Sequence, residues 1–596
     1  MRSAPRDGAQ FIAEFLKKSG VRYLFGIPGH GNVSIFDAAR DMAPDLNVVA
    51  VKHEQWGGHM ADGYFRANRR RPAAVTTSVG PGATNLATAF ATAYVDSSTF
   101  LAFTGQIQTY LFGRGIFQEV ERRHWVDYAN AMDHLVKGSW TVTSAAQLPR
   151  VMTESFRVAL GGRPGPVLVD VPMDVQVEKI DTAVPSVDRH LFGGRLRPDS
   201  DKIVEAAKLL LAAERPVVLV GGGVVMSDAS EEAVGIAEFL GAPALCTFRG
   251  DSKGGFPEDH ELYGFHPGNI GNAVSNEVAR SADVILAVGV TFSDETTSSY
   301  SPGVTFQIPP SKLIHIDIDQ HELGKNYPTE IGIVADAKAA LQDLMEAMKN
   351  LRRRGGPRTS AWLKRFKKLK GNWESEMENM RKESPMGIPN VVAAMRDRFP
   401  KSTIVTVSAG LPQEIMSQQW IAYGPRTFIS SGGFSTMGFG LPAAIGAKLA
   451  RPGVPVAAVE GDGSFMMNSV ELATAVQLEI PLAVIVLNNR GWVSIRDLQI
   501  RSFEKRTVGT EFAKRDGSSY EVDFEKLVKA YGAGYLLAST PAELKKSLDE
   551  ARSSSSPVVV EVEVEKRFPR SGTRAYGFWD IPSRYRRTGA RLSPAS

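Results

Sequence analysis

The chain has 596 residues, of which 43% are hydrophobic and 22% charged, and it carries a formal net charge of +4. This composition is ordinary for a soluble globular protein with several cores. The one cysteine, Cys246, excludes an intrachain disulfide framework and suits a reducing cytoplasm. No apolar run approaches the ~20 residues that span a bilayer, and the first residues lack a signal-peptide core, so no membrane association is expected.

Short apolar runs rich in β-branched residues recur along the whole chain, and helix-period stretches such as "GAQFIAEFLKKSG" and "PAELKKSLDEARSS" lie between many of them. The runs are "RYLFGI", "LNVVAV", "AAVTTS", "TFLAFTG", "GPVLVDVP", "RPVVLVGGG", "APALCTF", "ADVILAVGV", "KLIHIDID", "STIVTVS", "VPVAAVEGDG", "PLAVIVLNN" and "SPVVVEVEVE". Continuously apolar strands that alternate with helices predict parallel sheets covered on both faces. The fold class is therefore α/β, with doubly wound parallel sheets.

Three blocks are predicted, at residues 1–185, 195–345 and 385–565, with a charged helical linker before the third. The first and third blocks look alike in plan. A tail at residues 566–596 follows, in which eight Lys and Arg stand against one acid, Asp580. Such a tail is typical of a solvated or flexible end, and nucleic-acid binding is not expected.

Two tight turns in the third block follow apolar strands. One holds Gly461-Asp462-Gly463, and after 24 further residues the other holds Asn488-Asn489. A strand–helix–strand crossover leaves the carboxyl ends of parallel strands at one edge of the sheet, where ligands bind. Carboxylate and amide oxygens suit Mg²⁺, which prefers one or two protein oxygens together with phosphates. The segment therefore predicts a site for a metal-bridged diphosphate.

The helix after the first turn is expected to begin near Asn468 or Ser469, with Glu471 completing a capping box. Its free N–H groups would favour phosphate. The turn is not a Walker loop, because no Gly-Lys-Ser/Thr follows, and it lacks the third glycine of the dinucleotide fingerprint.

The pairing of "GDG" and "NN" resembles the thiamine diphosphate motif of thiamine diphosphate-dependent decarboxylases and synthases. The resemblance implies that the metal is held by the side chains of Asp462 and Asn489 and the carbonyl of Gly491. The residues implied as cofactor contacts are Ser408, Ala409 and Gly410 in "VSAGLPQ", Ser435 and Met437 in "SGGFSTMGFG", and Gly461, Gly463 and Ser464. The carbonyl of Ser435 would accept a hydrogen bond from the pyrimidine amino group, and Met437 would keep the two cofactor rings close.

The resemblance also implies a carboxyl group that hydrogen-bonds the pyrimidine ring and so activates the thiazolium carbon. Glu54 in "KHEQWGG" follows an apolar strand and matches this step. In "TTSVGPGATNL", the loop Gly80-Pro81-Gly82 would approach the pyrimidine. In the family the block that carries this glutamate meets the metal-binding block of another subunit, which implies a homodimer or homotetramer.

Substrate contacts are predicted in two loops of the first block. "FGIPGHGNV" is glycine-rich and follows a strand, so its backbone at Gly31 could approach the reacting carbonyl and His30 could hydrogen-bond a substrate oxygen. "GIFQEVERRHW" resembles a step of acetolactate synthases and places Phe117 and Gln118 at the pocket, with Glu119 as a structural residue. The substrate is expected to be a small carbonyl compound.

Acetolactate synthase is the family that the motifs resemble over roughly residues 8–565, which implies a lyase or transferase with carbanion chemistry. Two departures stand out. Thr291 and Glu295 in "VTFSDE" replace two arginines of that family, and arginine is the natural clamp for a keto-acid carboxylate. "GWVSIR" places Trp492 and Arg496 where the family has methionine and tryptophan.

Two alternatives remain open for the reaction. "GHGNV", "TSVGPGA", "SAG" followed by "LP" and "TSS" are similar to trihydroxycyclohexanedione hydrolase, which cleaves a neutral cyclic diketone, and "GIFQEVE" is similar to sulfoacetaldehyde acetyltransferase. The central block of acetolactate synthases holds a flavin, so FAD is an open expectation at "VVLVGGGVVMSDAS". The tail segment "YGFWDIPSRY" is expected to be a lid over the site or a frayed end.

Overall fold

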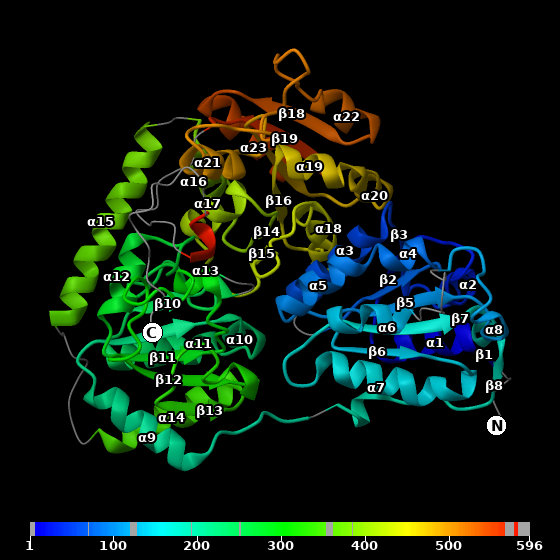
Figure 1. Ribbon diagram of the computed structural model, residues 1–596, viewed down its shortest axis with the longest axis horizontal. Helices are drawn as coiled ribbons and strands as arrows, with labels where there is room; N and C mark the ends of the chain where they lie inside the picture. The colour runs from blue at the N-terminus through cyan, green and yellow to red at the C-terminus, as the bar shows by residue number, and fades with distance from the viewer. Residues whose placement is uncertain are drawn as a thin grey trace.

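The computed structural model describes residues 6–68, 71–119, 128–191, 193–248, 252–352, 361–383, 386–566 and 577–581. Three blocks are arranged as a triangle in Figure 1, with the N-terminal block (β1 to β8) at the right, the central block (β9 to α14) at the lower left and the C-terminal block (α16 to β19) at the top. Each contains a parallel sheet flanked by helices, which confirms the α/β prediction. Every apolar run predicted as a strand forms one.

The N-terminal block is built on a six-stranded parallel sheet with strand order β3-β2-β4-β5-β7-β6. Its strands are β2 (Tyr23–Gly26), β3 (Asn47–Ala50), β4 (Ala74–Thr77), β5 (Leu101–Gln106), β6 (Gly138–Thr141) and β7 (Val167–Pro172), and β1 (Arg6–Asp7) pairs with β8 (Lys179–Ile180) separately. Its α-helices are α1 (Gly8–Lys18), α2 (Val33–Arg40), α3 (Glu54–Asn68), α4 (Pro81–Thr84), α5 (Ala87–Val95), α6 (Tyr128–Met132), α7 (Leu148–Leu160) and α8 (Met173–Val177).

The central block has a five-stranded parallel sheet in the order β10-β9-β11-β12-β13. The strands are β9 (Pro216–Val220), β10 (Ala244–Cys246), β11 (Val284–Val288), β12 (Lys312–Asp317) and β13 (Ile331–Val334). The helices are α9 (Ser200–Ala212), α10 (Gly222–Met226), α11 (Ser230–Leu240), α12 (Ala273–Ser281), α13 (Asp294–Thr297) and α14 (Ala337–Leu351).

The C-terminal block repeats the plan of the N-terminal one, with strand order β15-β14-β16-β17-β19-β18. Its strands are β14 (Ile404–Val407), β15 (Phe428–Ser430), β16 (Val456–Gly461), β17 (Ala483–Asn488), β18 (Gly534–Ala538) and β19 (Val558–Glu563). Its helices are α16 (Ile388–Arg398), α17 (Leu411–Gln419), α18 (Gly440–Ala450), α19 (Asp462–Asn468), α20 (Leu472–Gln477), α21 (Val493–Ser502), α22 (Phe524–Ala530) and α23 (Pro541–Ser553). In both blocks the first strand lies between the second and the third, so the expected likeness of plan is confirmed.

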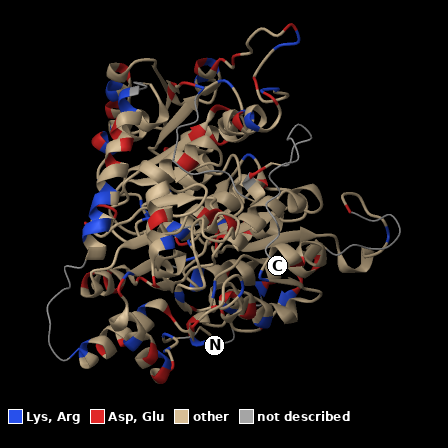
Figure 2. Cartoon of the chain, turned by 60° about the vertical axis from the view of Figure 1, so that its left-hand side comes forward, with Lys and Arg blue, Asp and Glu red and all other residues tan. Residues whose placement is uncertain are grey.

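The predicted charged linker is the long helix α15 (Ala361–Glu383), which runs beside the central block toward the C-terminal block (Figure 1). Basic residues crowd its first half and acidic residues its second (Figure 2). Its apolar side packs against the central block. Trp362 and Trp373 are buried, and the Trp362 indole N–H donates to the carbonyl of Pro216 in β9 at 3.1 Å. Within the described ranges no helix is both long and apolar enough to cross a bilayer.

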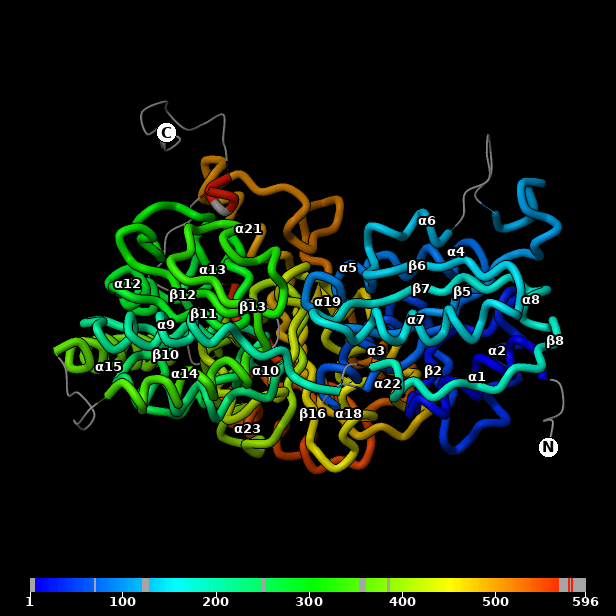
Figure 3. Tube along the Cα trace, turned by 90° about the horizontal axis from the view of Figure 1, so that it is seen from below, coloured from blue at the N-terminus to red at the C-terminus, as the bar shows by residue number. Residues whose placement is uncertain are grey.

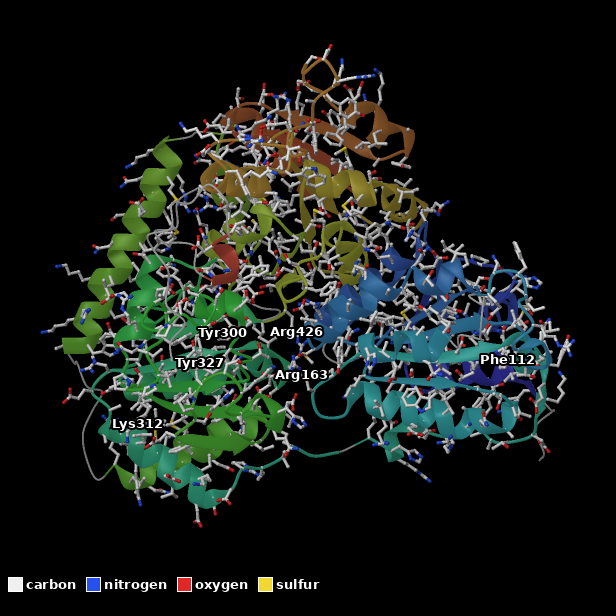
Figure 4. All side chains as sticks on the ribbon, viewed as in Figure 1. Phe112, Arg163, Tyr300, Lys312, Tyr327 and Arg426 are labelled. Carbon is white, nitrogen blue, oxygen red and sulfur yellow. The ribbon has the colours of Figure 1, made fainter. Side chains whose placement is uncertain are left out.

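The three blocks pack against one another directly, and the C-terminal block lies between the other two when the molecule is seen from below (Figure 3). Arg426 stands at the junction (Figure 4): it is buried, and its guanidinium donates to the carbonyls of Arg66 in the N-terminal block and Val225 in the central block, each at 3.2 Å. Arg66 is itself buried against Asp62 and donates to the carbonyl of Ser430 at 2.7 Å.

Helices α3 and α18 cross at backbone contact, which joins the N-terminal and C-terminal blocks. A Cβ atom at Gly446 would lie 1.8 Å from the carbonyl oxygen of Met60, and one at Gly63 would lie 2.3 Å from that of Ala443. Glycine on each helix therefore permits the crossing. The apolar residues around it belong to one continuous core that draws on both blocks.

We predict that Gly446→Ala lowers the free energy of unfolding by about 1–3 kcal/mol, because the new methyl group must push α3 away from α18. The midpoint of thermal unfolding measures this. Gly453→Ala is the matched control, because nothing lies within 4 Å of a Cβ atom there. Equal midpoints for the two variants would contradict the proposed close crossing.

Candidate active site

Asp462 and Asn489 meet at one edge of the C-terminal sheet, as the order of strands and helices predicts. β16 ends at Gly461 and β17 at Asn488, and the two strands are neighbours. The Asp462 carboxylate accepts hydrogen bonds from the backbone N–H groups of Gly463 at 2.7 Å and of Asn489 and Gly491 at 3.2 Å each. The carboxylate therefore fixes the shape of the turn after β17.

The oxygens at this edge fit a divalent cation. Asn489 is 6% exposed, and its side-chain oxygen has no hydrogen-bond partner among the described residues. A buried polar atom without a partner is costly unless a ligand completes it. Burial also raises the pKa of Asp462, against the opposing effect of the N–H groups around it. A cation between these two oxygens would relieve both penalties.

The expected third ligand is a backbone atom, the carbonyl of Gly491, which here also accepts the N–H of Val493 at 3.0 Å. The expected ligand set is one carboxylate, one side-chain amide and one backbone carbonyl. The described part of the chain contains no group of three or more His, Cys, Asp or Glu side chains that could hold a metal ion. Trp492 covers the first turn from above, since a Cβ atom at Gly463 would lie 2.2 Å from its ring.

The loop after β14 borders the same edge. Ser408 accepts the N–H of Gly440 at 2.8 Å through its hydroxyl oxygen, and Ala409 donates to the carbonyl of Thr436 at 3.3 Å. Gly410 has φ +104°, a conformation that favours glycine, and α17 begins directly after it. Because β14 and β16 flank the point where the strand order reverses, this loop and the Asp462 turn face one crevice.

The segment between β15 and α18 closes the crevice on another side. Ser435 has φ +54°, and its hydroxyl donates to the side-chain oxygen of Gln413 at 3.2 Å. The N–H of Gly438 donates to the hydroxyl of Ser464 at 2.7 Å, which ties this segment to α19. Met437 is 40% exposed, so core packing does not account for it.

In the N-terminal block the structure brings Glu54 and two glycines of the expected loop together. Glu54 opens α3, is 8% exposed, and accepts a hydrogen bond from the side-chain amide of Asn85 at 2.9 Å. A Cβ atom at Gly82 would lie 3.0 Å from a carboxylate oxygen of Glu54. Gly80, with φ +56°, lies against the carbonyl of Gln118, and Pro81 begins α4. Asn85 is a site residue that the sequence reading did not single out.

The loop after β2 lies beside this cluster. The N–H of Gly31 donates to the Ser78 hydroxyl at 3.0 Å, and its carbonyl accepts from the side chain of Gln176 at 2.6 Å. His30 is exposed. Phe117 is 86% exposed, whereas Gln118, with φ +72°, is half-buried against Gly80. Glu119 is the last described residue of its segment, and residues 120–125 of the same motif lie outside the described residues.

One local prediction is wrong. The helix after the "GDG" turn begins at Asp462, not near Asn468, and no capping box forms at Asn468. Glu471 instead directs its carboxylate into the N-terminal block, where it accepts hydrogen bonds from the backbone N–H groups of Lys52 and His53. The spacing of Asn468 and Glu471 imitates a cap, but a long-range contact takes the carboxylate.

The residues that depart from the acetolactate synthase pattern are placed as follows. Thr291 lines a cavity between the N-terminal and central blocks, and Glu295 is buried on α13. Arg496, on α21, forms an ion pair with Glu511, which Lys566 also contacts at 2.6 Å. The Arg496 guanidinium therefore shares one carboxylate of its own chain with the Lys566 ammonium.

The C-terminal segment reaches the central block. Residues 577–581 include the short 3-10 helix η8 (Gly577–Trp579), and the N–H of Phe578 donates to the hydroxyl of Ser299 at 3.2 Å. Ser298, Ser299 and Tyr300 all have positive φ, between 52° and 59°, and each such residue costs of order 1–3 kcal/mol. The rest of the expected basic tail, apart from Lys566, lies outside the described residues.

A cavity of about 1050 Å³ lies between the N-terminal and central blocks. Gly223 and Gly289 meet in its wall, where β9 and β11 flank the reversal of the central strand order. Arg163 reaches it from the N-terminal block (Figure 4) and pairs with Glu322 at 2.8 Å. Burial raises the pKa of Asp317 in its wall to about 6. Glycine turns, acids and an arginine at a switch point fit a nucleotide-type ligand.

Glu414 is a further residue near the site that the sequence motifs did not indicate. It lies in the first turn of α17, directly after the Gly410 loop. Burial raises its pKa to about 8, with Arg501 lowering and Asp497 raising it. Both of those groups are on α21, so the Glu414 carboxyl group lies within electrostatic range of that helix. A carboxyl group with a raised pKa beside the candidate cofactor site is a candidate for proton transfer.

Comparison with known protein families matches all three blocks. Residues 6–125 match the family described as "Thiamine pyrophosphate enzyme, N-terminal TPP binding domain". Residues 203–344 match the central domain of the same enzymes, and residues 408–562 match their C-terminal TPP binding domain. The last match contains both the Asp462 and the Asn489 turns.

Curated relatives match nearly the whole chain. A probable acetolactate synthase large subunit of Methanocaldococcus jannaschii is 37% identical over 94% of this chain and 92% of its own length. An acetolactate synthase of Arthrospira platensis is 33% identical over 94% of each chain, and one of Mycobacterium bovis is 34% identical over 93% of this chain and 87% of its own length.

We predict that Glu414→Gln changes how thermal stability depends on pH. The folded protein holds a proton on Glu414 up to about pH 8, whereas the unfolded chain releases it near its ordinary pKa of about 4.3. The wild type therefore loses stability as pH rises through that window, and the variant does not. The midpoint of the variant minus that of the wild type should grow with pH. Glu376→Gln, an exposed change on α15, should show no such trend.

Proposed function

This chain belongs to the family of thiamine pyrophosphate enzymes that includes the acetolactate synthase large subunits, and on that premise we propose that it is a thiamine diphosphate- and Mg²⁺-dependent carbon–carbon lyase or transferase. The proposed reaction is acetolactate synthase-like, with a 2-keto acid as donor. The observation that carries the proposal is the pair of turns in which the Asp462 carboxylate and the unpartnered oxygen of Asn489 share one sheet edge.

In the proposed site the C-terminal block holds the diphosphate end of the cofactor. Asp462, Asn489 and the carbonyl of Gly491 would hold Mg²⁺. The remaining contacts would come from the loop at Ser408, Ala409 and Gly410 and from Gly461, Gly463 and Ser464. Two features favour close approach of a phosphate there: a Cβ atom at Gly461 would meet only Pro412, at 3.7 Å, so the backbone is open at that residue, and α19 begins at Asp462.

The cofactor, when bound, supplies a thiazolium carbon that becomes a nucleophile toward a carbonyl group. Glu54 is proposed to hold and exchange the activating proton at the pyrimidine ring. Its hydrogen bond from Asn85 fixes one carboxylate oxygen, which leaves the oxygen beside Gly82 for the ligand. Ser435 and Met437 would support the cofactor between the rings, while Gly31, His30 and Gln118 would face the substrate.

A second candidate is hydrolysis of a neutral cyclic 1,2-dione. The observation that favours it is that Thr291 and Glu295 stand where the acetolactate synthase pattern has two arginines. Among the described residues, Arg496 is paired with Glu511. A neutral diketone needs no such clamp. An acetyl transfer of the sulfoacetaldehyde type is a weaker alternative, because it too uses an anionic substrate.

Assembly and a second cofactor complete the proposal. A homodimer or homotetramer would cover the exposed apolar side chains of Phe117, Phe434 and Met467, which lie in or beside the site motifs.

The cavity between the N-terminal and central blocks is proposed to hold FAD. A flavin absorption spectrum of the purified protein tests this.

We predict that the wild-type protein binds thiamine diphosphate only in the presence of Mg²⁺, and that Asp462→Ala abolishes this binding. The reason is that removal of the carboxylate takes away one metal ligand and frees the turn at Asn489. Quenching of tryptophan fluorescence during a titration measures binding. Asp516→Ala, on an exposed loop, should bind normally. A wild-type protein that takes up no cofactor with Mg²⁺ in excess would contradict the proposed function.

We predict that the loaded enzyme converts pyruvate to acetolactate, and that Glu54→Gln reduces turnover at least about 10²-fold because the activating proton has no carrier. Product analysis with pyruvate and with a cyclic 1,2-dione decides between the two reactions. Ring opening of the dione without acetolactate formation would replace the synthase proposal by the hydrolase. Glu54→Gln should retain cofactor binding, which separates activation from affinity.

A further inference from the structure

Glu471 occupies an unusual position for a carboxylate. It ends the 3-10 helix η7 (Ser469–Glu471) in the C-terminal block, its side chain is fully buried, and its partners lie in the N-terminal block. One oxygen accepts the backbone N–H of Lys52 at 2.9 Å and that of His53 at 3.2 Å. The other accepts the hydroxyl of Thr474 at 2.6 Å.

These hydrogen bonds replace solvation for a buried carboxylate. Burial raises the pKa of Glu471 to about 7, while the Thr474 hydroxyl and the two N–H groups oppose that change. Hydrogen bonds from N–H groups to a carboxylate are about twice as strong as those between neutral groups. Loss of the acceptor would also leave two partly buried N–H groups without this partner, which is unfavourable.

The two amides belong to the residues directly before Glu54. Lys52 and His53 form the turn between β3 and α3, and Glu54 is the first residue of α3. His53 also accepts the N–H groups of Trp56 and Gly57 through its carbonyl, so its placement sets where the helix starts. Any shift of this turn is passed to Glu54 within one residue.

The carboxylate is also joined to the proposed metal site by a short, continuous piece of structure. α19 starts at Asp462, and η7 and α20 follow it without a loop, so Asp462 and Glu471 are nine positions apart on consecutive helical turns. The same segment reaches the turn before Glu54 a second time, where the Lys52 ammonium donates to the side chain of Gln477 at 2.6 Å.

We propose that Glu471 is a positioning residue, whose carboxylate holds the Lys52–His53 turn and thereby sets the position of Glu54 at the cofactor. This rests on the proposed function for the role of Glu54. Glu471 does not touch the cofactor, so its removal should slow activation of the cofactor and leave cofactor affinity unchanged.

The first measurement uses the protein without cofactor. In Glu471→Ala, hydrogen exchange at the amides of Lys52 and His53 should become faster than in the wild type, because their acceptor is gone. In Glu471→Gln both amides should stay protected, since the amide oxygen can accept the same two hydrogen bonds. Unchanged amide exchange in Glu471→Ala would show that the carboxylate does not hold the Lys52–His53 turn, and it would overturn the proposal independently of any activity measurement.

The second measurement follows exchange of the thiazolium C2 proton of bound thiamine diphosphate by NMR. A displacement of about 1 Å can cost about 10²-fold in rate, so Glu471→Ala should slow exchange by up to that factor, with Glu471→Gln close to the wild type. Glu471→Asp, a milder change in case the alanine variant does not fold, should give an intermediate rate. A wild-type exchange rate in folded Glu471→Ala or Glu471→Asp would overturn the positioning role.

Gln477→Ala is the matched control. It removes a hydrogen bond between the same two segments, but one made to the exposed Lys52 side chain and not to the backbone, and it should leave both exchange rates unchanged. Failure of the wild type to bind thiamine diphosphate would contradict the proposed function, whereas normal binding with no effect of the Glu471 variants would contradict the positioning role alone.

Discussion

The carboxyl ends of parallel strands must share one edge of a sheet, and this constraint shapes the whole molecule. Each sheet reverses its strand order beside its first strand, so the loops on either side of that strand open into a crevice. In the C-terminal block these loops carry Ser408 and Asp462. In the N-terminal block they carry Gly31 and Gly80, and in the central block they carry Gly221 and Gly289. The glycine turns of all three blocks and the carboxylate of Asp462 lie at these reversals.

The crossing of α3 on α18 turns two similar blocks into one functional unit. Backbone contact at Gly63 and Gly446 leaves little freedom for the two sheets to shift relative to each other. The buried Arg66 reinforces the contact, because this α3 side chain donates to the carbonyl of Ser430 in the C-terminal block at 2.7 Å, a hydrogen bond that would be lost if the blocks separated. Close packing at the far end of α3 therefore limits the motion of its first residue, Glu54.

Much of this arrangement could be predicted from the sequence, because the strands of a buried parallel sheet can be recognised from their own residues alone. A continuously apolar run bounded by glycine shows up without knowledge of its neighbours, and each such run forms a strand. The strands that went unpredicted are short or lie at edges, such as β13, whose residues alternate between buried and exposed, and β18, which is largely exposed. The pairing of Asp462 with Asn489 was predictable because one crossover connects them. The hydrogen bond from Asn85 to Glu54 was not, because sequence patterns do not report which side chains meet across loops.

Glu471 shows how a local rule fails when tertiary structure competes for the same group. A serine or asparagine followed three residues later by glutamate predicts a cap because, in isolation, the nearest free N–H groups belong to the same helix. Here α19, η7 and α20 follow one another without a break, so no free helix start exists at Asn468 to be capped. The free N–H groups lie instead at the β3–α3 turn, which the packing of α3 on α18 presents to η7. The carboxylate accepts the hydrogen bonds of the free donors at that turn, and in this chain those donors precede Glu54, the proposed activating acid.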